Sequence, residues 1–292
     1  FSLFMAGTAS AKRYFLVADE TTITMPDGET VTAWGFGIDQ DDDYSTVDHV
    51  VSVPGPVLEI PFNHANFILR VKNNLPERIS LNIVGQRMTN NAGPTWDDGA
   101  RGARTPGNYT ARIRSFAHEC PPGAVRTYRW DGFKPGSFLV TSGTNPAKQI
   151  QMGLYAPVFK DAGRNQEAYP GVFYDRALNV VFSEVDSVIH TAVANGDYGL
   201  GRAITSSVYR EPNYFLINGM AFPDVGLEPL NGQIPLNLGE NILLRFYNAG
   251  GKTHVPQLLG QYMTLVAEDG LPYQFAKEQY GFELAAGKTT DA

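Results

Sequence analysis

Side chains that could bind a transition metal or carry redox chemistry are few in this chain. The five histidines stand alone, and the single cysteine, Cys120, is followed by PPGAVRT, with no histidine within reach. A blue-copper site needs cysteine, histidine and usually an axial methionine together. The nearest approach is His118-Glu119-Cys120, a candidate metal or redox site. A loop with a partly buried thiol is the competing interpretation.

His254 is the other candidate for metal binding. It stands at the edge of an expected strand, with no second histidine two residues away. One isolated imidazole supplies one ligand, whereas two histidines at i and i+2 on a strand point to one face. A hydrogen-bonded structural histidine is therefore the favoured interpretation of this position.

An acidic loop offers oxygen ligands of the kind that Ca²⁺ prefers. The spacing resembles the start of an EF-hand, but Tyr44 stands where that loop needs glycine, and no glutamate closes it. A loose surface Ca²⁺ site is one interpretation, and a solvated loop is the favoured one. The aspartates are Asp39, Asp41, Asp42, Asp43 and Asp48.

Composition narrows the classes of function that this chain can have. The chain has 292 residues, 43% of them hydrophobic and 18% charged, which is typical of folded domains and not of disorder. A net charge of −7 argues against a nucleic-acid surface, which needs clustered Lys and Arg. No apolar run is long enough for a transmembrane segment. One cysteine excludes an internal disulfide.

Residues 1–10 are expected to be a tail or the remnant of a secretory signal. They hold a short apolar run, followed by the A-x-A pattern of Ala9-Ser10-Ala11 before Lys12. An ordinary apolar tail is the alternative. The pattern favours export to the periplasm, the cell surface or the extracellular space.

The elements that must position these side chains are strands. Short β-branched and aromatic runs recur between Gly, Pro, Asn and Asp, which predicts a β-sandwich. A strand is expected over Arg13–Glu20. Pro26-Asp27-Gly28 between two threonine-rich runs predicts a hairpin, because glycine accepts positive φ.

An internal repeat sets the domain organisation. Asn66–Asn73 reads NFILRVKN, and 175 positions later Asn241–Asn248 reads NILLRFYN. A period of this length indicates a duplicated domain. We expect domain 1 over 11–160, a linker over 161–173 and domain 2 over 174–292. The counterpart of the segment around Met152 would fall beyond Ala292, so domain 2 is expected to lack its final strands and to expose a strand edge.

Several motifs in one order resemble the multicopper oxidases. PGPVLEI (54–60) precedes ILRVKNNL (68–75), and KPGSFLVTSGTNPAKQIQMGLYAPV (134–158) resembles the segment in which this family reads P-G-T-x-x-Y-H-S and then Q-x-x-M-G-L-Y-G. FLINGMAFPDV (215–225) and 243–273 resemble the second domain. The resemblance implies an all-β protein of two tandem cupredoxin-like Greek-key β-sandwiches, the second incomplete. It also implies copper-dependent oxidation of a reducing substrate, with electrons passed to O₂.

The family's copper ligands are missing at the positions that the resemblance assigns to them. The first histidine pair falls on Asn82 and Val84, and the second on Thr141 and Gly143. Imidazole nitrogens suit Cu(II), and none of these four residues has one. We therefore predict a framework without copper ligands or catalytic residues of its own. Copper would be present if the chain continues or if a partner supplies ligands.

Two classes of function remain open. In the first, the chain is framework in a multicopper oxidase, with further domains or partner chains that complete domain 2. In the second, it is an exported structural or interaction protein that kept the fold and lost the copper sites, its open edge accepting a strand from a neighbour or a second copy. A carbohydrate-binding sandwich is a third alternative, but no periodic aromatic strip supports it.

Overall fold

The computed structural model describes residues 10–44, 50–90, 93–102, 111–224 and 237–292. Nearly all of the expected tail, and Asp48 of the acidic loop, lie outside the described residues. Strands dominate the described chain, and its two helices are short, which confirms the all-β prediction.

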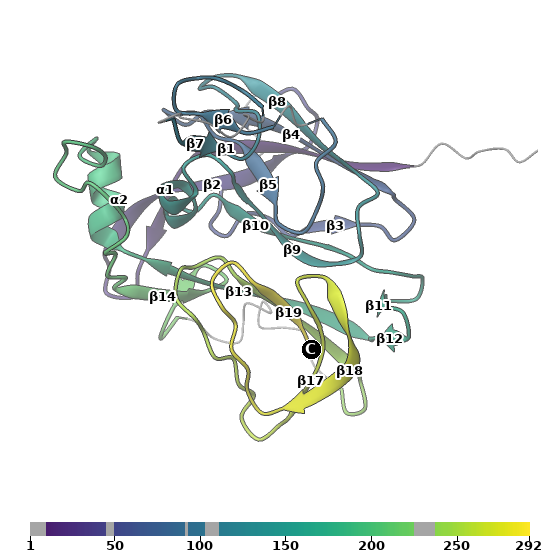
Figure 1. Ribbon diagram of the computed structural model, residues 1–292. Helices are drawn as coiled ribbons and strands as arrows, with labels where there is room; N and C mark the ends of the chain where they lie inside the picture. Colours follow the sequence, from purple (N-terminus) through teal and green to yellow (C-terminus); the bar gives the residue numbers. More distant parts are fainter. Residues whose placement is uncertain (1–9, 45–49, 91–92, 103–110, 225–236) are drawn as a thin grey trace, which may run out of the picture.

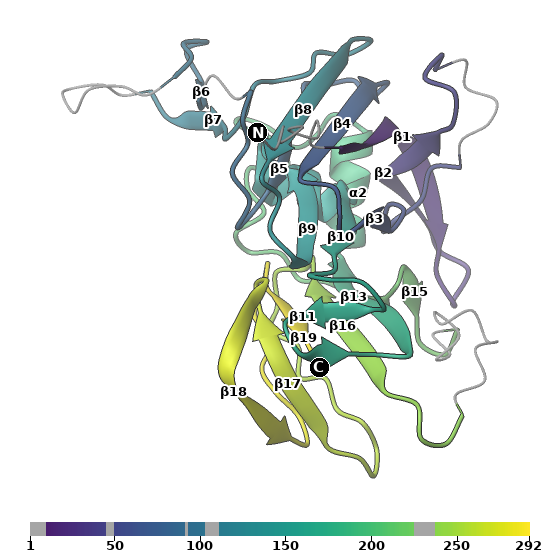
Figure 2. The same ribbon diagram turned by 90° about the vertical axis from the view of Figure 1, so that its right-hand side faces the viewer.

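The N-terminal half is a sandwich of two four-stranded sheets (Figures 1 and 2). One sheet has the order β2-β1-β4-β8, formed by Thr30–Asp39, Ala11–Thr24, Asn66–Asn73 and Val125–Asp131. The other has the order β3-β10-β9-β5, formed by Leu58–Ile60, Tyr155–Lys160, Gly136–Ser142 and Leu81–Ile83. A separate two-stranded sheet pairs β6 (Thr95–Trp96) with β7 (Ile113–Ser115).

Alternating side chains of the two facing sheets fill the core of this sandwich. Its fully buried members include Leu16, Phe67, Leu69, Tyr128 and Trp130. The first two strands pair antiparallel across the expected turn, where Gly28 has a φ of 86° that a β-carbon would disfavour. The strand expected over Arg13–Glu20 is present and is longer than expected, since β1 runs from Ala11 to Thr24.

The C-terminal half is one seven-stranded sheet with the order β15-β14-β13-β16-β19-β17-β18. In that order its strands are Met220–Ala221, Tyr214–Ile217, Arg176–Val185, Ile242–Asn248, Thr289–Asp291, Met263–Glu268 and Leu271–Gln279. The expected linker contains a hairpin of β11 (Glu167–Tyr169) and β12 (Val172–Phe173). Ala168 and Tyr169 of this hairpin are buried, so the segment packs against the sheet.

Two helices lie where the halves meet (Figure 1). Helix α1 (Pro146–Met152) follows β9, and α2 (Ser187–Ala194) follows β13. Asp186 caps α2 by accepting hydrogen bonds from the amides of Val188 and Ile189, both at 3.1 Å. On α2, the ring of His190 lies 2.7 Å from the carbonyl oxygen of Thr32 and 2.8 Å from that of Gln151. These contacts join α2 to the N-terminal half.

The internal repeat recurs as one hydrogen-bond pattern in both halves. Asn73 donates to the carbonyls of Glu77 and Cys120, and its own side-chain oxygen accepts from the Leu75 amide. Asn248 does the same with Lys252, Leu284 and the Gly250 amide. The asparagine that ends each repeated segment thus holds the following turn, which explains why the residue recurs.

A buried polar cluster, which we call the junction network, also connects the halves. Arg245 donates to Asp161 at 2.5 Å and to Ser137 at 3.1 Å, and Ser137 donates to Asp291 at 2.7 Å. The phenol of Tyr169 donates to the second oxygen of Asp291. Because Ser137 belongs to β9 and the others to the C-terminal half or the segment before it, this network joins the two halves.

One face of the C-terminal sheet carries an apolar groove of about 870 Å³. Its lining includes Val180, Phe182, Leu244, Phe246 and Met263. At one edge of the sheet lies β18, most of whose residues are exposed.

No helix in the described part of the chain is long and apolar enough to cross a membrane.

Candidate functional site

The four positions that the resemblance assigns to copper ligands lie at the ends of β5 and β9, with Val84 and Gly143 each one residue beyond its strand. Asn82 is the direct antiparallel partner of Thr141. A β-carbon added to Gly143 would lie 3.3 Å from that of Asn82. Val84, just after β5, is 68% exposed, whereas its neighbours Leu81 and Ile83 are buried in the core. The four positions therefore occupy the outer face of the sheet.

The donor set at these positions does not fit a copper centre. Asn82 offers an amide and Thr141 a hydroxyl, while Val84 and Gly143 have no side-chain donor. Cu(II) in proteins is held mainly by imidazole nitrogens. Strand pairing places these positions close together, but their side chains offer no imidazole to bind Cu(II).

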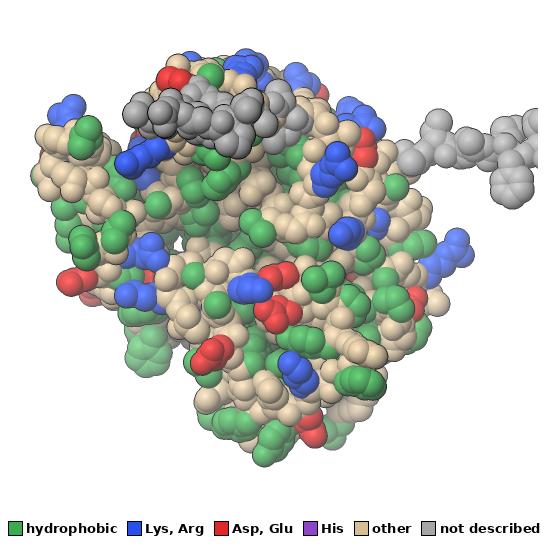
Figure 3. Space-filling model, in the orientation of Figure 1, with side chains coloured by type: hydrophobic (Ala, Val, Ile, Leu, Met, Phe, Trp, Pro, Cys, Tyr) green, Lys and Arg blue, Asp and Glu red, His purple; other side chains and the backbone are tan. Residues whose placement is uncertain are grey.

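Val84 and Thr141 line a cleft of about 270 Å³ between the two halves. The surface is hollowed between the upper and lower halves in Figure 3. The apolar wall of the cleft comes from β9 and α1 and from the end of β16. The polar side chains belong to both halves and include Thr141, Gln151, Tyr155, Ser183, Glu184, Arg210 and Asp269.

Glu184 is buried on the C-terminal side of this cleft and is fully hydrogen-bonded. It accepts from His254 Nε2 and the Gly251 amide, both at 2.8 Å, and from the Lys252 amide at 3.1 Å. Burial acts to raise the pKa of the Glu184 carboxyl, but these donors outweigh it and hold the pKa below its ordinary value. The candidate ligand His254 is thus engaged by Glu184, and its ring stacks on Phe182 at 5.0 Å.

Gly250 and Gly251 allow two charged side chains to reach the cleft. A β-carbon on Gly250 would lie 2.3 Å from Glu184 Oε1, and one on Gly251 would lie 1.2 Å from Arg210 Nη2. No other residue fits at either position without displacing a charged group. This explains the Gly-Gly pair where the first repeat has Leu75-Pro76.

Arg210 is a charged group in the cleft without a carboxylate partner. Among the described residues, no Asp or Glu oxygen lies within 4.0 Å of its guanidinium, and its buried Nε has no hydrogen-bond partner. The flanking backbone is fixed. Ser207 donates to the Ala147 carbonyl on α1 at 3.2 Å, and the Glu211 amide donates to Asp186 at 2.8 Å.

His118 and Cys120 lie in the N-terminal sandwich, away from this cleft. Cys120 is completely buried, and its thiol donates to the Ala124 carbonyl at 3.3 Å. Burial raises the pKa of the Cys120 thiol to about 11. His118 stacks on Tyr128 at 4.4 Å, with Nε2 at 3.1 Å from the Thr127 carbonyl. The Cys120 thiol is thus held in the core, and His118 is held by its ring contact and Nε2, while its buried Nδ1 has no hydrogen-bond partner among the described residues.

Cys120 should therefore react slowly with a disulfide reagent in the folded protein. With the pKa raised from 9.0 to about 11, the thiolate fraction at neutral pH falls roughly 100-fold. We expect Ellman's reagent to label Cys120 at least 100-fold faster in 6 M guanidinium than in buffer. Comparable rates in the two conditions would instead identify an accessible, reactive thiol and favour the redox interpretation of His118-Glu119-Cys120.

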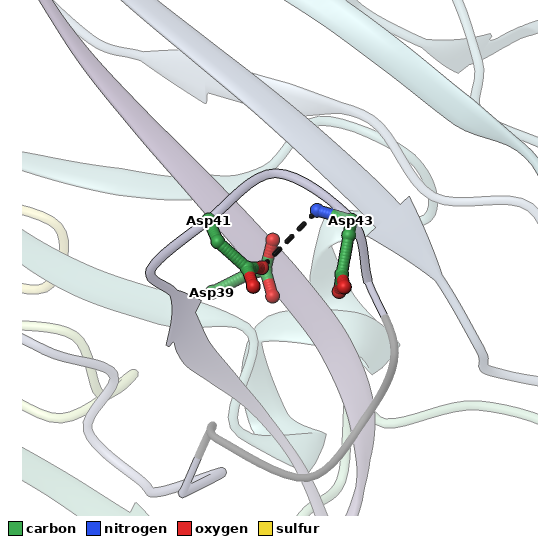
Figure 4. Close-up of side chains that lie close together, drawn as sticks. All are labelled: Asp39, Asp41 and Asp43. Carbon is green, nitrogen blue, oxygen red and sulfur yellow. Dashed lines mark hydrogen bonds between the residues drawn. The ribbon is translucent and has the colours of Figure 1, made fainter.

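Asp39, Asp41 and Asp43 gather in the loop after β2 (Figure 4). One oxygen atom from each lies within 4.8 Å of the others. The Asp43 amide donates to Asp41 at 3.3 Å, and nearby Asp42 pairs with Arg70 at 2.5 Å. Asp41 and Asp43 are exposed, whereas Asp39 is buried and accepts from the Tyr44 amide at 3.4 Å, so hydrogen bonds within the loop account for this arrangement.

The sequence alone pointed to none of Ser183, Glu184 and Arg210. Each belongs to a stretch without a catalytic motif, and their partners come from segments up to 70 residues away. The one signal was Gly250-Gly251, a glycine pair at the end of a repeated strand.

No protein-family model and no curated protein sequence matches this chain. Solved structures do. A blue copper oxidase from Nitrosomonas europaea superposes with a TM-score of 0.67 at 16% identity, over 97% of this chain and 74% of the other. A copper nitrite reductase from the same organism gives 0.64 at 18%, over 97% and 84%.

The laccase from Botrytis aclada gives a TM-score of 0.61 at 21% identity, over 97% of this chain and 46% of the laccase. The chain thus spans less than half of that protein. These similarities show that the chain has the cupredoxin fold found in multicopper oxidases. At such identities they show the fold alone.

Proposed function

We propose that this chain is the framework of a multicopper-oxidase-type protein, without a copper centre of its own. The observation that carries the proposal is the face of β5 and β9, where Asn82, Val84, Thr141 and Gly143 meet without an imidazole. Copper-dependent oxidation of a reducing substrate, with electrons passed to O₂, would use ligands from outside these residues. The chain would hold the domains or partner chains that carry those ligands in position.

The proposed framework consists of two tandem copies of one domain, over 11–160 and 174–292, joined by 161–173. The equivalent hydrogen bonds of Asn73 and Asn248 support the duplication. The Ala9-Ser10-Ala11 pattern supports export. The negative net charge supports partners other than nucleic acid.

Copper content and native mass of the purified protein test this proposal. We expect less than about 0.1 copper per chain after dialysis, because two oxygen donors on a strand pair hold Cu(II) weakly. One or more tightly held copper ions in a 32.0 kDa species would overturn it. If copper is found in a larger assembly, the chain and its partner are separated in mild denaturant, and the copper content of each is measured. Copper that stays with this chain contradicts the proposal, and copper that leaves with the partner supports it.

The second candidate function is a non-catalytic interaction protein. The apolar groove of about 870 Å³ on the C-terminal sheet favours it, since contiguous exposed apolar surface marks contact sites. The edge strand β18 offers backbone groups to a partner strand or a second copy. A native assembly that contains no copper and oxidises no phenolic or metal substrate would favour this candidate.

A further inference from the structure

We propose that the cleft between the two halves binds a small monocarboxylate with an apolar body, held at its charged end by Arg210. This site does not involve copper, so it stands or falls independently of the framework proposal. The residues of the site come from both halves of the chain, so a bound ligand would contact both halves at once.

Arg210 supplies the charge that selects an anion. A guanidinium presents several N–H groups in a planar fork that matches a carboxylate. The Arg210 fork lies over Gly251, and among the described residues it meets no carboxylate within 4.0 Å. Because its Nε is buried without a hydrogen-bond partner, binding a carboxylate would provide a missing acceptor.

Two hydroxyls line the same cleft as Arg210. The Ser183 hydroxyl is buried and makes no hydrogen bond of normal geometry. Burial raises the pKa of the Tyr155 phenol, and the nearby Ser183 hydroxyl offsets only part of this rise, so Tyr155 stays protonated at neutral pH. An O–H donor is what a carboxylate oxygen requires.

The remaining wall accepts an apolar body. Leu139 and Ala249 are nearly buried, and Ile150 on α1 packs against them. An apolar cavity of ~150 Å³ holds one benzene molecule. The 270 Å³ of this cleft therefore accommodates one ring and a carboxylate, and little more.

The two acidic residues of the cleft limit the ligand to one negative charge. Glu184 is saturated by His254 and two amides. Asp269 is held by Lys288 at 2.5 Å and accepts from the Thr289 amide at 3.1 Å. Two acidic side chains thus line the cleft with Arg210, and a dianion such as phosphate would meet more repulsion from them than a monocarboxylate.

Calorimetric titration with benzoate, its neutral analogue benzamide and inorganic phosphate tests the site. We expect saturable binding of one benzoate per chain, with benzamide and phosphate at least tenfold weaker. Arg210→Gln should weaken benzoate at least tenfold, because a charge-assisted pair is lost, and should leave benzamide unchanged. Arg202→Gln, an exposed neighbour outside the cleft, is the matched control and should change nothing.

Three results would overturn the proposal. The first is no saturable benzoate binding up to about 10 mM, which is weaker than the millimolar affinity that one charge-assisted contact supports. The second is equal affinity for benzoate and either benzamide or phosphate. The third is equal benzoate affinity in wild type and Arg210→Gln. If Arg210→Gln fails to fold, Arg210→Lys and Ser183→Ala replace it, and unchanged affinity in both would likewise contradict the site.

Discussion

Replacing Arg245 with methionine should lower the free energy of unfolding by about 3–5 kcal/mol, the usual cost of removing one partner from a buried ion pair. The side chain of Arg245 is 0% exposed and donates to Asp161 and Ser137 of the junction network. Its guanidinium also lies 4.4 Å from the centre of the Phe159 ring. Methionine fills much of the volume, but it leaves Asp291 and Asp161 without their cation. Urea unfolding followed by fluorescence measures the loss.

The repeat provides the control for this experiment. Arg70 occupies the equivalent place in the first repeated segment, but its side chain is 40% exposed and pairs with Asp42. Since exposed pairs contribute about 0–1 kcal/mol, Arg70→Met should cost less than about 1 kcal/mol. Equal losses in the two variants would show that the junction network does not hold the halves together.

The loss in Arg245→Met should also depend on pH. Burial raises the pKa of Asp291, and Arg245 opposes that rise. Without the guanidinium, the folded-state pKa of Asp291 rises further above its unfolded value of 3.8. A carboxyl with a raised folded pKa is stabilising when protonated and destabilising as pH rises through the unfolded value. The difference between the variant and wild type should therefore be smaller near pH 4 than at pH 7.

Two histidines placed at Asn82 and Thr141 should create a Cu(II) site. Directly opposite residues of an antiparallel pair have β-carbons about 4.5–5.5 Å apart, which suits chelation by two imidazoles. Both positions lie half-buried on the outer face of β5 and β9, so the substitutions should cost less than about 1 kcal/mol. We expect one bound Cu(II) per chain with at least tenfold higher affinity than wild type, measured by titration with electron paramagnetic resonance.

Asn82→His with Arg126→His is the matched control for this pair. It also adds two histidines, but Arg126 belongs to β8 in the other sheet of the sandwich, so the two rings cannot share one ion. If both double variants bind copper equally, the four positions do not form the face that the strand register describes. Stronger binding by the Asn82/Thr141 pair would indicate that the fold keeps the frame of a copper site whose ligands differ.

The fold was largely predictable because its signals are local. Gly28 and its neighbours specify a hairpin, and Asn73 and Asn248 hold equivalent turns through their own hydrogen bonds. Such features depend on residues close in sequence, so repeated motifs reveal them. The positions at the ends of β5 and β9 were predictable for the same reason, because the two residues of each pair stand only two positions apart in the sequence.

The cleft depends on the tertiary structure. Val84, Thr141, Ser183 and Arg210 meet in it only because α1, α2 and the junction network set one half against the other. No periodicity in the sequence encodes a distance between such remote segments.

Arg70 and Arg245 show most directly which properties the sequence determines and which depend on the tertiary structure. The sequence by itself determined that both arginines follow three apolar residues of a repeated strand. Only the tertiary structure decided that the Arg70 side chain is 40% exposed, whereas Arg245 contacts Ser137 of β9 and is fully buried. The physical reason is that burial and its electrostatic consequences depend on what packs against a strand, which the strand's own residues do not specify.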